Sequence, residues 1–177
     1  NRFLDRFIDT ARRIKVGDPF DSDVFYGPMI NQSAVHKGQT FNEKARGRFK
    51  VLLDRNNEPA PTTHGFWLRP FVYETEWKTS DDVLQEEPFS PHVAIVPVYD
   101  VEDAVRIYND TPFGLSAAVV TSDYNKARWA EDHLDCGLFY WNLPCIGADV
   151  RLPFGGVKQS GNLIPSAAGI IPNRHRY

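Results

Sequence analysis

The first helical pattern lies at the start of the chain. Apolar side chains recur there at intervals of three and four residues, with arginine and aspartate between them: Phe3, Leu4, Phe7, Ile8, Ala11 and Ile14. This spacing predicts an amphipathic helix that ends before the Gly-Asp-Pro turn at residues 17–19. A second helix is predicted to reach about Phe49, with Asn31 or Ser33 as its N-cap. No N-cap precedes the first helix, so we expect that Asn1 is not a natural terminus.

Extended segments follow the two helices. Residues 50–54, 66–75 and 93–99 are rich in apolar and β-branched side chains and favour strands. Pro70 lies inside the second segment and has no N–H to donate, so that segment is predicted to be an edge or bulged strand. The third segment is apolar almost throughout, which is typical of a strand inside a core.

The second half of the chain alternates helices with strands. Helices are predicted at 101–109, capped by Asp100, and from Ser122 or Asp123 to about Leu134. Strands are predicted at 115–121 and 137–141, both of them buried. Short links between these elements predict a parallel α/β sheet, in which ligands bind beyond the carboxyl ends of the strands. Asn142 stands at such an end.

A long irregular segment follows Asn142 and carries several glycines. Such loops often bind ligands. The adjacent pair Gly155 and Gly156 permits backbone angles closed to other residues and lets the main chain approach a ligand closely. A tight surface turn is the alternative interpretation of the pair alone.

Composition narrows the class of protein. The chain has 177 residues, of which 42% are hydrophobic and 24% charged, and this predicts one globular domain over residues 1–177. A net charge of −3 gives no case for nucleic acid or an anionic membrane, although loops and helix N-termini can still bind phosphate. No apolar run approaches the ~20 residues of a membrane span. Neither a signal peptide nor a metal-ligand spacing is visible, and with Cys136 and Cys145 as the two cysteines we expect a reducing cytoplasm.

The motif after Asn142 resembles a known family. Asn142 at a strand end, followed by PFGGVKQSG at residues 153–161, is similar to the C-terminal signature of the NAD(P)-dependent aldehyde dehydrogenases. Further similarities lie in the turns at 17–19 and 27–28 and in residues 109–115, so that the resemblance covers nearly the whole chain. It implies the parallel-sheet catalytic domain of that fold, with three layers, α/β/α.

A second motif, EEPFSP at residues 86–91, is similar to the family's E-E-x-F-G-P. The resemblance implies that Glu87 accepts hydrogen bonds from the nicotinamide ribose hydroxyls and that Phe89 packs near the nicotinamide, whereas such carboxylates alone are most often solvated loop charges. Ser90 departs from the motif, which has glycine there, and His92 stands where an apolar residue is common. If the glycine has positive φ, serine costs roughly 1 kcal/mol or shifts the loop.

The resemblance also implies a substrate site. Asn142 and Phe154 would line the aldehyde tunnel, and Ser160, Gly161 and Asn162 would bind the polar tail of an acidic semialdehyde. Lys158 is either an anion ligand or an exposed loop lysine. The tail GNLIPSA at residues 161–167 resembles the succinylglutamate semialdehyde dehydrogenase branch, which acts in arginine breakdown.

The catalytic groups of such an enzyme are expected elsewhere. By the family pattern, the nucleophilic cysteine, the glutamate base and the dinucleotide-binding fold lie upstream of Asn1. Cys145 has no adjacent base, and Cys136 is interpreted as a packing residue. We therefore expect this chain alone to be inactive and to bind NAD or NADP weakly. The full-length enzyme would take a small aldehyde and form a homodimer or homotetramer.

A different class of function stays open. The chain would then be an interaction or scaffold domain that keeps the aldehyde dehydrogenase fold without catalysis, and Ser90 in place of the motif glycine favours this alternative.

Overall fold

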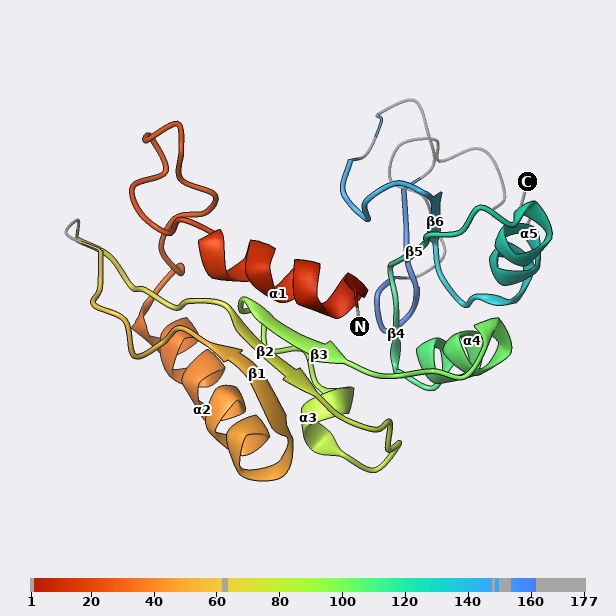
Figure 1. Ribbon diagram of the computed structural model, residues 1–177, viewed down its shortest axis with the longest axis horizontal. Coiled ribbons are helices and arrows are strands. Elements are labelled where there is room, and N and C mark those ends of the chain that lie inside the picture. The colour runs from red at the N-terminus through yellow and green to blue at the C-terminus, as the bar shows by residue number, and fades with distance from the viewer. Residues whose placement is uncertain (1, 62–63, 148, 150–153, 162–177) are drawn as a thin grey trace. The chain divides into compact units, whose positions relative to one another are not determined.

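The computed structural model describes residues 2–61, 64–147, 149 and 154–161. The chain divides into two compact units, unit 1 (Asn1–Pro97) and unit 2 (Val98–Tyr177). Each unit has its own strands and its own hydrophobic core, and Figure 1 labels their elements.

Unit 1 begins with the two predicted helices. α1 spans Arg2–Arg13 and α2 spans Gln32–Arg48. Asn31, one of the two candidate caps, is the N-cap of α2, because its side-chain oxygen accepts a hydrogen bond from Ala34 N at 2.8 Å. Both helix predictions are confirmed.

A mixed three-stranded sheet follows the helices in unit 1. Its strands, in spatial order, are β1 (Lys50–Asp54), β2 (Phe71–Glu74) and β3 (His92–Ile95). β2 pairs antiparallel with β1 and parallel with β3, so it is the central strand. The prediction of an edge strand was wrong, because Pro70 precedes the first paired residue and therefore removes no hydrogen bond from the ladder. The irregularity lies in β1, where the register shifts between Val51 and Leu53.

Helices cover both faces of this sheet (Figure 1). On one face, α1 packs through Ala11 against Leu53 and Val72. Phe71 and Tyr73 point to the opposite face because side chains alternate along a strand. There they pack against α2 and the short helix α3 (Asp82–Gln85), with the core residues Phe41, Ala45 and Val83. Unit 1 alone is therefore a three-layer α/β/α structure.

Unit 2 contains the two further helices that the sequence predicts. They are α4 (Val101–Asn109) and α5 (Tyr124–His133). Asp100 caps α4 by accepting from Asp103 N at 2.8 Å, and Asp123 caps α5 by accepting from Asn125 N at 2.9 Å. Both caps were predicted, the second as one of two alternatives.

The strands of unit 2 form two pairs. The parallel pair is β5 (Ser116–Val119) with β6 (Leu138–Trp141), and the antiparallel pair is β4 (Phe113–Gly114) with β7 (Val157–Lys158). Ala117 and Phe139 of the parallel pair pack against both helices. The prediction that both strands are buried was wrong: in β5 only Ala117 is buried, and in β6 the first residues are half-buried and Trp141 is 38% exposed. Within the described residues, β5 is the one partner strand of β6.

The alternation of helices with parallel strand pairs confirms the predicted α/β fold class. The strand predicted at 93–99 is shorter than expected, because pairing with β2 ends at Ile95. In the part of the chain that the structure describes, no helix has both the length and the apolar character to cross a membrane.

Candidate active site

The segment predicted to bind the cofactor lies between α3 and β3. Glu86 is the C-cap of α3, and its backbone N donates to Asp82 O at 3.0 Å. Glu87 is exposed, and Phe89 is 77% exposed. Phe89 has a φ of +53°, in the left-handed region that a bulky side chain rarely adopts. Both predicted cofactor contacts are therefore open to a ligand.

Ser90 does not carry the strain that its departure from the family motif predicts. Among the described residues, the positive φ of this segment belongs to Phe89 and not to Ser90. The side chain of Ser90 instead lies against α2 at Gly38, where an added Cβ would be 3.1 Å from Ser90 Cβ. Its hydroxyl oxygen is buried, with no hydrogen-bond partner in the described part of the structure.

His92 anchors the other end of the segment inside unit 1. Its Nδ1 lies 2.9 Å from Oδ1 of Asn42, and its Nε2 lies 3.2 Å from the hydroxyl of Tyr73. An amide oxygen can only accept, so Nδ1 carries the proton and Nε2 accepts from Tyr73. Burial lowers the pKa of His92 to about 4 and raises the pKa of Tyr73 to about 12. The imidazole is therefore neutral and the phenol protonated at neutral pH.

Asn142, a predicted substrate contact, directly follows β6 in unit 2. Its side-chain oxygen accepts from Thr121 N, and its side-chain nitrogen donates to Thr121 O, both at 2.9 Å. Its backbone N donates to Val119 O, also at 2.9 Å. Asn142 has a φ of +53°. The amide thus fastens the carboxyl ends of β5 and β6 together.

Two glycines, one in the loop at 154–161 and one that faces it, are required because a side chain would not fit there. A Cβ on Gly156 would lie 2.4 Å from the carbonyl oxygen of Ser160, and one on Gly137 would lie 1.6 Å from that of Gly155. The φ of Gly156 is not positive. Glycine is therefore required there by lack of space, and not by the unusual backbone angles that the sequence predicts. The close approach that the sequence predicts is made here by the protein's own backbone. This loop touches the start of β6, whereas Asn142 stands at its end.

Lys158 and Ser160 fasten the same loop to the α4–β4 connection. Lys158 Nζ donates to Asn109 O at 2.7 Å and to Thr111 O at 3.1 Å, so it satisfies carbonyls at the C-terminal end of α4. Ser160 Oγ accepts from Gly114 N at 3.1 Å. Lys158 is exposed, as one of the two interpretations of the sequence has it, and its ammonium group also caps α4, which neither interpretation included.

Positive φ angles coincide with the predicted motifs. Three non-glycine residues of the described chain have positive φ: Phe89, Asn142 and Lys158. Backbone strain of this kind gathers at functional sites, because it persists only where the surrounding structure determines it. Each of the three lies in a segment that the sequence motifs single out.

The comparison with known sequences identifies the family of the chain. Residues 1–168 match the aldehyde dehydrogenase family. The chain belongs to this family. Relatives include 1-pyrroline-5-carboxylate dehydrogenase from Geobacillus sp. (strain WCH70), 32% identical over 162 residues, and α-ketoglutaric semialdehyde dehydrogenase from Bacillus subtilis (strain 168), 30% identical over 164 residues. Each alignment covers 91% of this chain, but 31% and 33% of the relative.

Solved aldehyde dehydrogenase structures agree with the fold. 1-Pyrroline-5-carboxylate dehydrogenase from Thermus with bound NAD is similar with a TM-score of 0.84 and 28% identity, over 93% of this chain and 31% of that one. Betaine aldehyde dehydrogenase from Staphylococcus aureus in complex with NAD+ gives a TM-score of 0.81 and 28% identity, over 91% of this chain and 32% of that one. The chain thus spans about a third of the length of the relatives that it matches.

The other predicted residues of the aldehyde dehydrogenase site are half-buried, exposed or outside the described residues. Phe154 is half-buried, and Gly161 is exposed next to Gly156. Asn162 lies outside the described residues. Cys136 packs beside the core of unit 2, as predicted, and Cys145 is exposed.

Sequence reasoning missed two residues that support the predicted cofactor segment of this aldehyde dehydrogenase chain. Lys37 of α2 donates from Nζ to the carbonyl oxygen of Glu87 at 2.9 Å, and Asn42 of the same helix bonds to His92. About fifty residues separate each pair along the chain. No local pattern points to such partners, because a lysine and an asparagine on a helix are ordinary surface residues.

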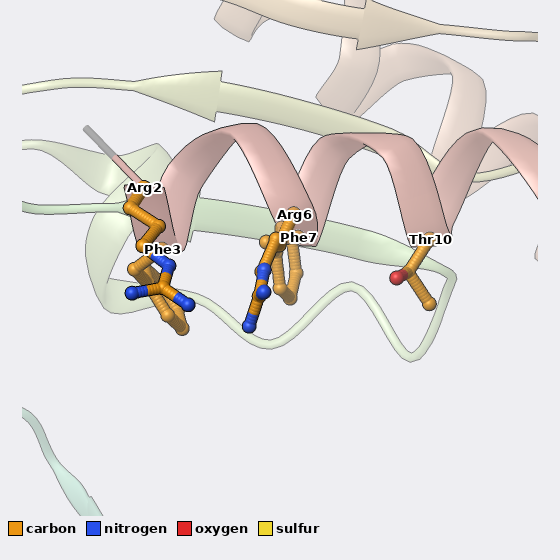
Figure 2. Close-up of a pocket in the computed structure, with 5 residues that line it drawn as sticks. All are labelled: Arg2, Phe3, Arg6, Phe7 and Thr10. Atoms are coloured by element: carbon orange, nitrogen blue, oxygen red, sulfur yellow. The ribbon is translucent and has the colours of Figure 1, made fainter.

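A separate depression of about 460 Å³ lies along α1 (Figure 2). The side chains that line it project from one side of that helix: Arg2, Phe3, Arg6, Phe7 and Thr10. It contains none of the residues that the aldehyde dehydrogenase motifs single out, and we assign it no part in the site.

Proposed function

We propose that this chain is the C-terminal part of the catalytic domain of an NAD-dependent aldehyde dehydrogenase that oxidises a semialdehyde to a carboxylic acid. In that reaction aldehyde and water give the acid, and a hydride passes to NAD. The nucleophilic cysteine and the glutamate base belong, on this proposal, to the part of the enzyme upstream of Asn1. The chain by itself is then inactive.

The geometry of Glu87 and Phe89 is the observation that carries the proposal. An exposed carboxylate is an acceptor suited to a ribose diol, and an exposed aromatic ring two residues later offers a flat apolar surface to a nicotinamide. The left-handed φ of Phe89 keeps the ring out of the core. The chemistry of these two side chains supports the proposal of a nicotinamide nucleotide, and NAD is bound in the Thermus relative.

Substrate class is the finer part of the proposal. The names of two relatives refer to 1-pyrroline-5-carboxylate and α-ketoglutaric semialdehyde, which carry a carboxylate beyond the reacting carbon. We propose an acidic semialdehyde for this enzyme, and succinylglutamate semialdehyde of arginine breakdown as the first to test. Ser160, Gly161 and Asn162 are the proposed contacts of the anionic tail, and Asn142 and Phe154 the proposed tunnel wall. We further propose a cytoplasmic homodimer or homotetramer.

The scaffold alternative loses its sequence argument. Ser90 was its support, but the structure accommodates Ser90 without positive φ, so the substitution leaves the segment able to present Glu87.

The deciding experiment measures NADH formation by the full-length protein. We expect kcat/KM for succinylglutamate semialdehyde to exceed that for the cationic betaine aldehyde by at least about 10-fold, because polar groups that bind a carboxylate tail stay unpaired with a cationic one. Glu87→Gln should raise the KM for NAD. A full-length protein without aldehyde-dependent NADH formation would support the scaffold instead. A parallel assay with NADP shows which dinucleotide is used.

A further inference from the structure

The core of unit 1 contains a polar cluster, made of Asn42 of α2, Tyr73 of β2 and His92 of β3. Nδ1 of His92 lies 2.9 Å from Oδ1 of Asn42, and its Nε2 lies 3.2 Å from the hydroxyl of Tyr73. Asn42 is 3% exposed and Tyr73 1%. Apolar side chains of the same shape in place of hydrogen-bonded partners are often as stabilising. Stability alone therefore does not account for the polar cluster.

His92 joins the polar cluster to the segment 86–91, which carries the proposed cofactor contacts. It is the first residue of β3, and its backbone N donates to Ser90 O at 2.7 Å. The preceding residue, Pro91, accepts a hydrogen bond of 2.9 Å from the backbone N of Phe71. The end of the segment is thus held where the imidazole of His92 is bound to α2.

Aromatic rings surround the imidazole of His92. Phe71 stacks on it with a centroid distance of 5.8 Å and an angle of 15° between the planes. Phe41 and Tyr73 approach it edge-on, at 6.1 and 5.0 Å. These rings replace little of the hydration that a charged imidazole needs, so burial lowers the pKa of His92 to about 4. The surroundings therefore favour the neutral ring.

Charged groups of the elements packed around the polar cluster do not counter this preference. Three cations of α2 lie over the rings that enclose His92: Lys37 and Lys44 over Phe41, and Arg46 over Phe71. The carboxylates of β1, β2 and the start of α3 are each paired with another cation: Asp54 with Arg46, Glu74 with Lys50, Asp81 with Arg48, and Asp82 with Lys44 and Arg48. A proton on Nε2 of His92 would therefore create a buried charge beside other positive charges.

We propose that the polar cluster is a pH-sensitive switch for the segment 86–91. While the imidazole is neutral, His92 holds the end of this segment against α2. When Nε2 takes up a proton, His92 moves into water and the segment leaves α2 with it, so that Glu87 and Phe89 lose their places and the affinity for NAD falls. The inference rests on the proposed function of those two residues. His92 stands where the family commonly has an apolar residue, so the switch is a feature of this chain.

The size of the effect follows from the protons that the two states bind. The pKa of the ring is about 4 in the held state and 6.5 when released, so the held state loses stability as pH falls from 6.5 towards 4. Over this interval each pH unit multiplies the equilibrium constant for release by at most about 10. From pH 7 to pH 5 the constant should rise by about 5- to 20-fold, where the lower figure allows for the partial exposure of His92.

Hydrogen exchange in the full-length enzyme tests the release without a ligand. Phe71 N donates to Pro91 O at one end of β2, and Thr75 N donates to Ile95 O at the other. After correction for the intrinsic pH dependence of exchange, Phe71 should lose protection by about 5- to 20-fold between pH 7 and pH 5. At pH 5 it should exchange at least about 10-fold faster than Thr75, because release does not require unfolding. Equal protection at both amides would mean that His92 leaves α2 only when unit 1 unfolds, and would overturn the switch.

The dissociation constant for NAD measures the functional consequence. In the wild-type enzyme it should rise by at least about 3-fold from pH 7 to pH 5. The triple variant Asn42→Leu/Tyr73→Phe/His92→Phe replaces every member of the polar cluster with an apolar residue of similar size and leaves no partner unpaired. Its NAD affinity and its protection at Phe71 should change by less than about 2-fold over the same interval. If the triple variant does not fold, His92→Phe alone provides the comparison.

His36→Gln is the matched control, because it removes an exposed imidazole from the same helix. This variant should keep the pH dependence of the wild type. A triple variant that also keeps it would overturn the switch, since the titrating group would then lie elsewhere.

Glu87→Gln at pH 7 tests the underlying proposal separately. If this substitution leaves NAD binding unchanged, the proposed function of the segment is overturned, and the control of NAD binding with it, whatever hydrogen exchange shows at Phe71. If Glu87→Gln weakens NAD binding but the protection of Phe71 does not change with pH, the switch is overturned and the proposed function stands.

Discussion

Nδ1 of His92 lies 2.9 Å from Oδ1 of Asn42, and this contact joins the first residue of β3 to the middle of α2. Asn42 is 3% exposed, so its amide has no access to bulk water. A buried polar pair of this kind is stable only while both partners are present. It fixes the proposed cofactor segment at its C-terminal end.

Asn42→Leu tests this pair directly. The leucine nearly preserves the volume of the side chain but leaves Nδ1–H of His92 buried and unpaired, which should lower the free energy of unfolding by about 1–3 kcal/mol. Tyr73→Phe removes only the hydroxyl that faces Nε2 and should cost about 0.5–1.5 kcal/mol. Denaturant titration of both variants provides the comparison. If Asn42→Leu leaves the free energy of unfolding unchanged, the pair contributes nothing to stability.

Acid should weaken the same structure. The pKa of His92 is lowered from 6.5 to about 4 because burial disfavours the charged ring. The unfolded state therefore binds more protons between these two pH values, and stability falls as pH drops from about 6.5 to about 4. We expect His92 to contribute about 1–2 kcal/mol of this loss, after allowance for partial solvent exposure.

His92→Phe isolates that contribution, because phenylalanine keeps an aromatic ring against Phe71 but does not titrate. The free energy of unfolding is compared at pH 7 and pH 4.5 for both proteins. The variant should lose less stability over this interval than the wild type does. Equal losses would mean that the imidazole keeps an ordinary pKa in the folded state.

Local sequence signals predicted the helices and their caps. Asn31, Asp100 and Asp123 each stand directly before a helical pattern, and each accepts a backbone hydrogen bond in the first turn. These caps depend on neighbours within a few residues. The family motifs also singled out Phe89 and Asn142, but the partners of Asn142 lie 21 residues away at Thr121, and the roles of both residues in binding stay predictions.

Features that depend on distant neighbours were not predictable. Pro70 indicated an edge strand, yet β2 is central because Lys50–Asp54 and His92–Ile95 pair on its two sides. The alternatives for Lys158 did not include its contact with Asn109, which is 49 residues away. The strain predicted at Ser90 is absent, because the positive φ belongs to Phe89. A motif shows which residue replaces a glycine, but it does not show which residue of the segment has the positive φ.

Two substitutions of Asn142 separate what its backbone conformation and its side chain contribute to stability. Asn142→Ala loses both hydrogen bonds to Thr121 and keeps a φ of +53° that alanine tolerates poorly. Asn142→Gly loses the same bonds but relieves the backbone. We expect the alanine variant to be less stable than the glycine variant by about 1 kcal/mol. Thermal unfolding of the two variants provides the measurement. A more stable alanine variant would contradict the positive φ of residue 142.

The loop that holds Ser160 and Gly161 should depend on Gly137. An added Cβ there would lie 1.6 Å from the carbonyl oxygen of Gly155, and a backbone atom cannot rotate away as a side chain can. Gly137→Ala should therefore displace the loop from β6 and lower the free energy of unfolding by about 2–4 kcal/mol. In the full-length enzyme it should also raise the KM for the semialdehyde.

Gly47→Ala is the control for that substitution, because Gly47 lies in α2 and an added Cβ there meets nothing within 4 Å. Alanine is the better helix former, so this variant should gain about 0.5–1 kcal/mol. Opposite signs for one and the same chemical change would show that space, and not glycine as such, decides the outcome. If Gly137→Ala is as stable as the wild type, the loop does not lie against the start of β6, and the proposed place of the substrate tail at Ser160 must be revised.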